Sequence, residues 1–305
     1  MRAIQAVQIG SIEIFCKAAE TRSFSAAAEA LGLTPASVSR SVKRLEERLG
    51  VRLFSRTTRN VRLSAEGELY WRECRQALGQ IEEAERAITG KQEVPRGLLR
   101  ISTGSLFANY RLLPQLKRFT EAYPNIEVEL SLSNRVVDIV HEGYDIAIRI
   151  GTPEDSRLIA VSLDDAQVGI YATPEYLTKR GSPTTLDELA HHDCLQFILP
   201  TTGRPMPWIL RMPDGSEIDY MFRSPLRVLD DPSGCISWGL AGGGLFQTYR
   251  FIADEAVSRG RLVEVLSSYG GRSRRFSLIY PQNRHMSTRV RAFIDFMRGS
   301  ALAKK

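Results

Sequence analysis

Cysteine is scarce in this sequence, and its four copies stand far apart along 305 residues, at Cys16, Cys74, Cys194 and Cys235. None belongs to a CxxC pair, so the spacing argues against a zinc site and against a small fold held together by disulfides. We interpret all four as reduced thiols that mainly fill buried positions. A thiol switch between Cys194 and Cys235 is the alternative that the sequence leaves open.

Long apolar runs are also missing. No segment approaches the roughly 18 apolar residues that a helix needs to cross a bilayer, and residues 1–10 lack the apolar core of a signal peptide. Glycine and proline are scattered and form no low-complexity tract. The sequence therefore predicts a folded cytoplasmic protein without a membrane partner, and its length favours about two domains.

The motifs of common enzyme sites are absent as well. There is no P-loop, no GxSxG elbow and no GxGxxG after a predicted strand. The ligand-type residues at positions 191–194, His-His-Asp-Cys, are too close in sequence to form a good metal site without a second cluster. We therefore predict no catalytic residue, no metal and no cofactor. An enzyme on a two-lobed scaffold is the less favoured alternative.

Positive charge is concentrated near the N-terminus. Residues 1–62 contain eleven Lys and Arg against five Glu and no Asp, whereas the remainder has 41 − 11 = 30 basic and 35 − 5 = 30 acidic residues. Eight of the eleven cations lie between positions 40 and 62. Such clustering is typical of a surface that meets a phosphate backbone, although a solvated basic face would give the same count.

Two short helices are predicted at the start of the chain. Apolar residues recur at helical spacing over 12–19. Ser25 is a candidate N-cap for a second helix over 26–31, and Gly32 suits the left-handed position after its end. A short helix that ends in a glycine turn is the first half of a helix-turn-helix.

A third helix is predicted from Thr34, as N-cap, to Gly50, with Pro35 in its first turn. Its periodicity separates an apolar stripe from a face of small, hydroxylated and cationic side chains. In a helix-turn-helix this helix enters the major groove, and its first turns meet base edges. The residues expected to bind double-stranded DNA are Ser25, Thr34, Pro35, Ala36, Ser37, Ser39, Arg40, Lys43 and Arg44.

A wing is predicted after this helix. Short strands over 51–54 and 61–63 would flank the polar loop 55–60. Arg56 and Arg59 in that loop would reach phosphates or the minor groove beside the third helix. Such contacts fix the register of the protein on DNA more than they specify sequence.

One long helix is predicted over 64–88, capped by Ser64. A heptad seam runs along it through Leu63, Gly67, Tyr70, Cys74, Ala77, Ile81, Ala84 and Ile88. We expect this seam to pair with a second copy of the chain, which would set two recognition helices one or more DNA turns apart on a partly palindromic site. Packing against the protein's own domains is the alternative.

Beyond about residue 93 the pattern changes to strands that alternate with helices, as in an α/β domain with crossover connections. Strands are predicted over 98–102, 126–132, 144–150, 166–171, 195–199, 225–229, 245–249 and 276–280. Helices are predicted over 110–123, 136–141, 232–241, 252–259 and 287–297. About 210 residues of this kind suit two lobes better than one sheet.

Ligands of open α/β sheets bind beyond the carboxyl ends of strands. Hydroxyls, backbone N–H groups and one guanidinium follow such ends in this sequence. The expected effector-binding residues are Ser102, Thr103, Gly104, Ser131, Arg149, Gly151, Thr201 and Asp230. Arg149 is the candidate partner of an effector carboxylate, which favours an organic acid; an ion pair between lobes is the alternative.

Dense groups of residues resemble the signature of LysR-type transcriptional regulators. They occur at 15–20, 23–28, 38–40, 45–46, 49–50, 53–56 and 63–67, and again at 97–102, 123–124, 137–140, 143–151, 172–177 and 290–294. The resemblance covers nearly the whole chain. One departure is Pro35-Ala36, where many members carry Gln-Pro after the capping Ser or Thr. The missing Gln removes a bidentate partner for adenine.

The resemblance implies a DNA-binding transcriptional regulator controlled by a small-molecule effector. Its expected architecture is an all-α winged helix-turn-helix over 1–63, a dimerisation helix over 64–92 and a two-lobed α/β effector domain over 93–305. That domain would resemble a type 2 periplasmic binding protein, with lobe I about 93–163 and 266–305 and lobe II about 164–265. A homodimer or homotetramer is expected, with RNA polymerase as a candidate partner. A thiol-based redox-sensing regulator would share the DNA step and differ in its trigger.

Overall fold

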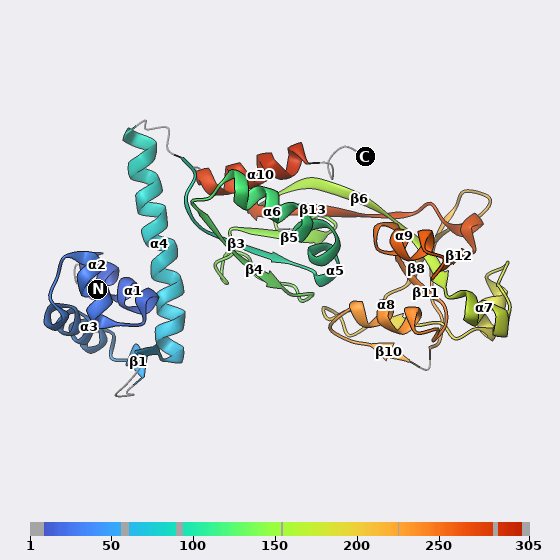
Figure 1. Ribbon diagram of the computed structural model, residues 1–305, viewed down its shortest axis with the longest axis horizontal. Helices are drawn as coiled ribbons and strands as arrows, with labels where there is room; N and C mark the ends of the chain where they lie inside the picture. Colours follow the sequence, from blue (N-terminus) through green and yellow to red (C-terminus); the bar gives the residue numbers. More distant parts are fainter. Residues whose placement is uncertain are drawn as a thin grey trace. The chain divides into compact units, whose positions relative to one another are not determined.

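The computed structural model describes residues 9–55, 61–89, 94–153, 155–224, 226–282 and 286–300. The chain forms two compact units, and the boundary between them falls between Gln92 and Glu93 (Figure 1). Each unit has a hydrophobic core of its own.

Four helices and a small ribbon make up the described part of the N-terminal unit (Figure 1). The helices are α1 (Ile9–Thr21), α2 (Phe24–Leu31), α3 (Pro35–Leu49) and α4 (Ala65–Thr89). The ribbon pairs β1 (Phe54–Ser55) with β2 (Arg62–Leu63) in antiparallel fashion. The apolar faces of the helices converge on a core whose fully buried members include Phe15, Val38 and Leu53.

Local capping sets the limits of α3 as the sequence predicts. The Thr34 hydroxyl accepts a hydrogen bond from the Ser37 N–H, and Pro35 occupies the first turn. Gly50 follows the last turn in the left-handed conformation, with φ of 72°. The three residues that the sequence singles out therefore determine where this helix begins and ends.

The cap of α2 differs from the prediction. Ser23, not Ser25, adopts the extended N-cap conformation, and its hydroxyl accepts a hydrogen bond from the Ala26 N–H. The helix consequently starts at Phe24, two residues earlier than expected. Ser25 lies inside the first turn with its side chain exposed.

A seven-stranded mixed sheet runs through the C-terminal unit in the order β11-β6-β13-β5-β3-β4, with β12 also paired to β6. The strands β3 (Gly97–Thr103), β4 (Ile126–Leu132) and β5 (Ile146–Ile150) are parallel. By contrast, β13 (Ser273–Pro281) runs antiparallel to both β5 and β6 (Leu158–Ala172). The remaining strands are β7 (Gln196–Phe197), β8 (Trp208–Arg211), β9 (Glu217–Tyr220), β10 (Arg227–Val228), β11 (Phe246–Tyr249) and β12 (Val263–Val265).

The long strands β6 and β13 extend through two lobes of this unit (Figure 1). The first lobe lies around one end of these two strands. It contains β3, β4 and β5 with the helical run α5 (Ser105–Phe107), η1 (Ala108–Leu112) and α6 (Leu113–Ala122), together with α10 (Thr288–Gly299). The second lobe lies around the other end and contains β7 to β12 with α7 (Pro174–Arg180), α8 (Ser233–Leu240) and α9 (Arg250–Ser258). The short 3-10 turns η2 (Asp187–His191) and η3 (Ser267–Tyr269) complete the chain. The two-lobed α/β architecture agrees with the prediction.

One predicted helix is wrong. Residues 136–138 are irregular and residues 139–141 form a turn. The buried apolar side chains follow a spacing of two and not of three or four, because Val137 and Ile139 pack against Ala147 and Ile279. The carboxylate of Glu142 accepts the Asp138 N–H at 3.2 Å and further fixes the turn.

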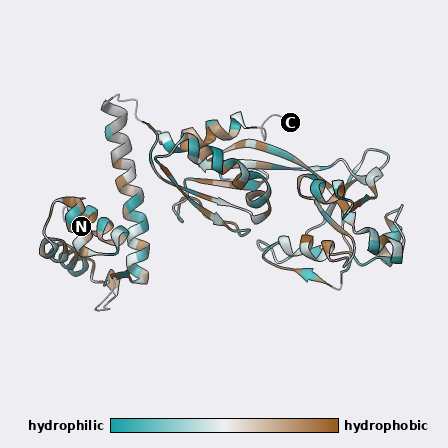
Figure 2. Ribbon diagram, in the orientation of Figure 1, coloured by the Kyte–Doolittle hydropathy of each residue, from teal (hydrophilic) through white to brown (hydrophobic). Residues whose placement is uncertain are grey.

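Strand limits also differ from the prediction. Strand β6 begins eight residues before the predicted 166–171, since it spans both lobes, and the expected strands over 195–199 and 225–229 shorten to the two-residue pair β7 and β10. The β8–β9 hairpin, β12 and α7 were not expected. In Figure 2 hydrophobic colour concentrates on the strands of the large sheet, whose core members are fully buried at Leu99, Ile101 and Ile146.

Candidate nucleic-acid interface and effector site

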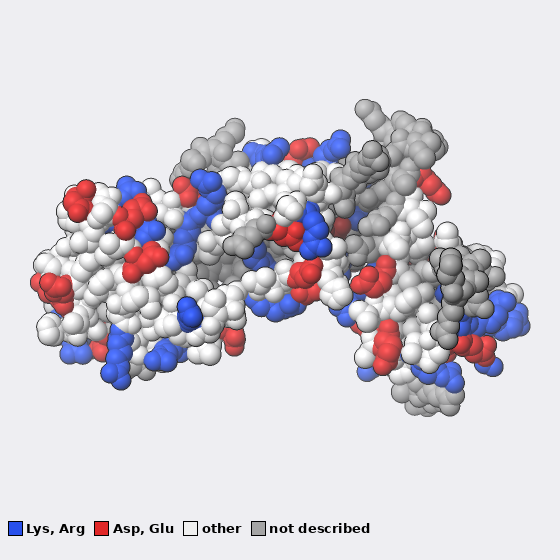
Figure 3. Space-filling model, turned by 180° about the vertical axis from the view of Figure 1, so that it is seen from behind, with Lys and Arg blue, Asp and Glu red and all other residues white. Residues whose placement is uncertain are grey.

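The first half of α3 presents an exposed polar and cationic face. Ala36, Ser39, Arg40, Lys43 and Arg44 are exposed, as expected, whereas the opposite stripe is buried in the core. In Figure 3 blue side chains gather at the edge of the N-terminal unit, with acidic residues among them. This face offers guanidinium, ammonium and hydroxyl donors to a phosphate backbone or to base edges.

A hydroxyl network organises the start of this face. The Thr34 and Ser37 hydroxyls are 2.9 Å apart, and Arg40 Nη2 donates to Ser37 Oγ at 3.3 Å. Ser37 is half-buried, and its hydroxyl already takes part in both of these hydrogen bonds. Of the residues predicted to contact DNA, Arg56 and Arg59 lie outside the described residues.

Glu46 is a positioning residue that the sequence analysis missed. Its carboxylate accepts the backbone N–H groups of Leu53 at 2.7 Å and Phe54 at 3.2 Å, and it pairs with Arg52 at 3.2 Å. A buried carboxylate on α3 thus ties the first strand of the ribbon to the predicted recognition helix. A glutamate at an interior position of an otherwise apolar stripe was the available signal.

The predicted seam of α4 is buried within the protomer over its first part. Tyr70 and Cys74 belong to the core of the N-terminal unit, and Gly67 lies against the backbone of Leu53. The first half of the seam therefore packs within the protomer, which was the alternative reading. Further along the same face, Ile81 is exposed.

The C-terminal unit brings two of the predicted effector residues together. Arg149 Nη2 donates to Ser102 Oγ at 2.7 Å, and Arg149 Nη1 donates to the carbonyl of Ile148 at 2.9 Å. Ser102 is fully buried. Burial lowers the pKa of the Arg149 guanidinium to about 10.

Polar atoms around this pair lack partners. Arg149 Nε and the hydroxyl oxygen of Ser277 are buried without a hydrogen-bond partner within the described part of the chain. The Thr103 hydroxyl also has none there, but Thr103 follows Ser102 on β3 and pairs with Ile148, so its side chain lies on the opposite face of the sheet. Ser277 pairs with Arg149 in the register of β13 and β5, so its hydroxyl belongs to the same neighbourhood. Buried donors and acceptors left unpaired cost roughly 1–3 kcal/mol each, so a polar ligand or water that satisfied them would be stabilised.

A hydrogen-bonded clasp connects the lobes beyond the end of β3. Asn134 of lobe I accepts the Ser105 N–H at 3.2 Å and donates from Nδ2 to the carbonyl of Asp230 in lobe II at 3.0 Å. Ser105 Oγ also donates to Asp231 Oδ1 at 2.6 Å. Gly104 fits here because an added Cβ would stand 2.9 Å from Asn134 Oδ1. Gly104 and the backbone of Asp230 are thus both neighbours of Asn134, an asparagine that was not predicted.

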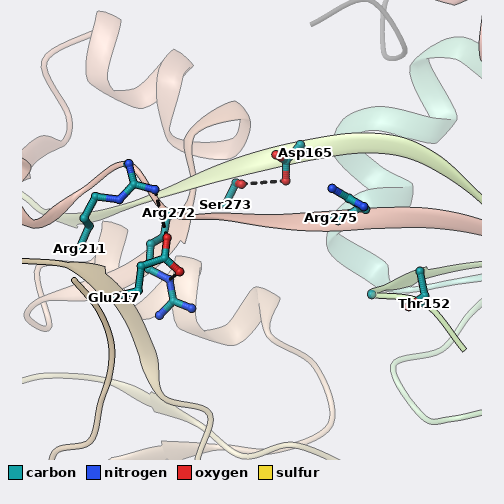
Figure 4. A pocket seen from close by; sticks show the side chains of 9 residues that line it. Thr152, Asp165, Arg211, Glu217, Arg272, Ser273 and Arg275 are labelled. Atoms are coloured by element: carbon teal, nitrogen blue, oxygen red, sulfur yellow. Dashed lines mark hydrogen bonds and ion pairs between the residues drawn. The ribbon is translucent and has the colours of Figure 1, made fainter. Parts of the chain in front are cut away.

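Ser131 is brought beside the Ser102–Arg149 pair, because it is the register partner of Ser102 on β4, where it is half-buried. Two other predicted effector residues lie elsewhere. Thr201 is in an exposed turn of lobe II. Gly151 lines a separate polar cavity of about 420 Å³, shown in Figure 4.

That cavity contains its own network of charged side chains. Arg211 pairs with Glu217 at 3.1 Å, and Ser273 Oγ donates to Asp165 at 2.7 Å. In Figure 4 these residues project from the β8–β9 hairpin and from β6 and β13. Most of its charge is therefore internally compensated, unlike that of Arg149.

The two cysteines considered for a thiol switch do not form a pair. Cys194 and Cys235 belong to different hydrophobic clusters, and burial raises the pKa of each thiol to about 12. In the described ranges there is no group of three or more potential metal ligands. None of the described helices is long and apolar enough to span a membrane.

Comparison with known proteins finds family models that match both units of the chain. The family model described as "Bacterial regulatory helix-turn-helix protein, lysR family" matches residues 9–68, and the model "LysR substrate binding domain" matches residues 92–301. An uncharacterised HTH-type transcriptional regulator of Escherichia coli, YhjC, is 34% identical over 292 residues, which cover 96% of this chain and 97% of YhjC.

Solved structures of similar proteins extend over both units. The LysR-type transcriptional regulator CrgA from Neisseria meningitidis is 31% identical, with a TM-score of 0.60 and coverage of 96% of this chain and 98% of CrgA. The full-length virulence activator AphB from Vibrio cholerae is 27% identical, with a TM-score of 0.61 and coverage of 97% and 100%.

Proposed function

The chain belongs to the LysR family of DNA-binding transcriptional regulators with an effector-binding domain, and from this premise we propose that α3 enters the major groove of its operator. The supporting observation is the exposed face of α3, where Arg40 and Lys43 follow the Thr34 cap at helical spacing. The wing would lie on the adjacent backbone. Because the Gln-Pro of many members is replaced by Pro35-Ala36, base preference at that step would rest on other side chains.

Two substitutions test this placement. Arg40→Ala and Lys43→Ala remove cations from an exposed surface, so we expect weaker operator binding, a salt dependence reduced by about one unit per lost phosphate contact, and an unchanged unfolding transition. Lys117→Ala, on the exposed surface of α6, is the matched control. Operator affinity retained in both α3 variants, measured by fluorescence anisotropy, would show that another surface binds the groove.

For the C-terminal unit we propose that a small organic acid binds between the lobes and places its carboxylate at Arg149 and Ser102. The support is a half-buried guanidinium that forms no ion pair with a described carboxylate, next to the Ser277 hydroxyl, which has no hydrogen-bond partner among the described residues. A carboxylate there would supply a negative charge opposite the Arg149 guanidinium and oxygen atoms that accept its unpaired N–H group. The acid would bias the spacing of the lobes and thereby the arrangement of the two recognition helices.

Thermal shift with benzoate, succinate and citrate tests the ligand class, and benzamide is the neutral counterpart of benzoate. We expect at least one acid to raise the melting temperature of the wild type, benzamide to have no such effect, and Arg149→Met to lose the response. Arg157→Met, at an exposed arginine paired with Asp155, should respond like the wild type. An equal response of Arg149→Met and the wild type would exclude Arg149 as the anchor.

The same proposal makes the functional unit a homodimer or tetramer that binds double-stranded DNA in the cytoplasm. Two copies related by a two-fold axis would read the two halves of a partly palindromic operator. RNA polymerase is then the partner whose access to the promoter the bound oligomer controls. Homologues are named as transcriptional regulators, which supports a role without enzymatic turnover.

A further inference from the structure

Helices α1 and α4 contact each other through a ladder of side chains. The rings of Phe15 and Tyr70 lie 5.5 Å apart, and Glu20 forms an ion pair with Arg75. On both helices the second contact lies closer to the C-terminal end than the first. Cys16 follows Phe15 directly on α1, and on α4 Cys74 stands one turn after Tyr70 and directly before Arg75.

The two thiols therefore meet between these contacts. Cys16 is 3% exposed and Cys74 is 6% exposed, and both belong to the same hydrophobic core. Cys16 and Cys74 each act on the pKa of the other thiol, and Tyr70 also acts on the pKa of Cys74. A disulfide between the two cysteines would bring their sulfur atoms to about 2.05 Å.

The surroundings make one thiol the nucleophile. The side chains of Cys16 and Tyr70 lower the pKa of Cys74 to about 7, against the opposing effect of burial. The side chain of Cys74 in turn raises the pKa of Cys16. Arg48 of α3 favours the Cys74 thiolate, whereas neighbouring Glu73 opposes it. The lowered pKa favours the Cys74 thiolate, which is the reactive form of a cysteine side chain.

We propose that Cys16 and Cys74 form a peroxide-oxidisable modification site, at which an intramolecular disulfide joins α1 of the winged helix-turn-helix to the long helix α4. The Cys74 thiolate attacks one oxygen of hydrogen peroxide; the S–O bond forms, the O–O bond breaks, and the departing hydroxide takes up a proton to leave as water. Cys16 then attacks the Cys74 sulfenic acid, so that the S–S bond forms and the S–O bond breaks. The released hydroxide takes the Cys16 proton and leaves as a second water.

The disulfide would close a loop that contains α2, α3 and the ribbon. It would prevent α1 from separating from α4 and would stabilise the N-terminal unit mainly by restricting its unfolded chain. We expect its melting temperature to rise by about 5 °C or more on oxidation and to return on reduction with dithiothreitol. This step is independent of any effector in the C-terminal unit.

Peptide mapping of the full-length protein after hydrogen peroxide treatment tests the proposal without any substitution. The expected product is a crosslink between the peptides that contain Cys16 and Cys74, within one chain and sensitive to dithiothreitol. The Cys194→Ser/Cys235→Ser variant should form the same crosslink, and Cys16→Ser should trap oxidised Cys74 without a disulfide. Intact thiols at both positions, a crosslink to Cys194 or Cys235, or a disulfide between subunits would each overturn the proposal.

Discussion

Gly67 at the start of α4 lies so close to Leu53 that an added Cβ would stand 1.9 Å from the Leu53 carbonyl oxygen. The same carbonyl accepts the Ser64 N–H at 2.9 Å. The backbone before the ribbon and the first turn of α4 are thus in direct contact, and only glycine allows this approach. The Ser64 side chain adds to this contact, because its hydroxyl donates to the Arg52 carbonyl at 2.6 Å and accepts the Gly67 N–H at 2.9 Å.

We therefore expect Gly67→Ala to destabilise the N-terminal unit by about 3 kcal/mol, because a backbone segment must move to admit the methyl group. Gly79→Ala is the matched control on the same helix, where nothing lies within 4 Å of an added Cβ. It should stabilise α4 by up to about 1 kcal/mol through helix propensity. Urea unfolding followed by circular dichroism measures both; equal stabilities of the two variants would contradict the close contact.

A second prediction concerns the carboxylate that holds the ribbon. Glu46→Ala leaves the buried N–H groups of Leu53 and Phe54 without their acceptor, so we expect a loss of about 3 kcal/mol and weaker operator binding. Glu46→Gln keeps one acceptor oxygen and should lose less. Glu47→Ala removes an exposed carboxylate 3.7 Å from Lys43 and should change stability by less than about 0.5 kcal/mol. A loss for Glu47→Ala as large as that for Glu46→Ala would refute this assignment.

How well an element can be predicted from the sequence depends on how far apart in the chain the residues that stabilise it lie. The limits of α3 were foreseen because Thr34, Pro35 and Gly50 act on backbone groups within one turn. The segment 136–141 was mistaken for a helix because its geometry depends on Ala147 and Ile279, which come from two strands of the folded sheet. Periodicity over six residues cannot distinguish a short helix from a turn whose apolar side chains pack against a sheet.

The candidate sites show the same contrast. Ser102 and Arg149 were each recognised as residues near strand ends, and the parallel pairing of β3 with β5 then brings them together. Asn134 was missed because its partners, Ser105 and Asp230, stand 29 and 96 residues away in the sequence. A single polar residue in a loop gives no local signal of such distant contacts.

The interlobe clasp gives a third prediction. Asn134→Ala removes the acceptor of the Ser105 N–H and the donor to the Asp230 carbonyl. We expect amide hydrogen exchange at Ser105 to accelerate at least about tenfold, since a net stabilisation of about 1.4 kcal/mol corresponds to that factor. Asn125→Ala, at an exposed asparagine before β4, should leave this rate unchanged. Unaltered exchange in Asn134→Ala would mean that the lobes stay closed without the clasp.

The exposed continuation of the α4 seam gives the last prediction. By helical spacing Ile81 lies on the same face as Tyr70 and Cys74, beyond the part of the seam that packs within the protomer. It is 41% exposed, and a charge there would oppose apolar pairing with a second α4. Ile81→Glu should therefore shift sedimentation at micromolar concentration towards smaller species and weaken operator binding accordingly. Leu69→Glu, at a 56% exposed leucine about 120° around the same helix, should preserve the oligomer. If only Leu69→Glu dissociates the assembly, the contact uses the other face of α4, and if neither does, the copies associate elsewhere.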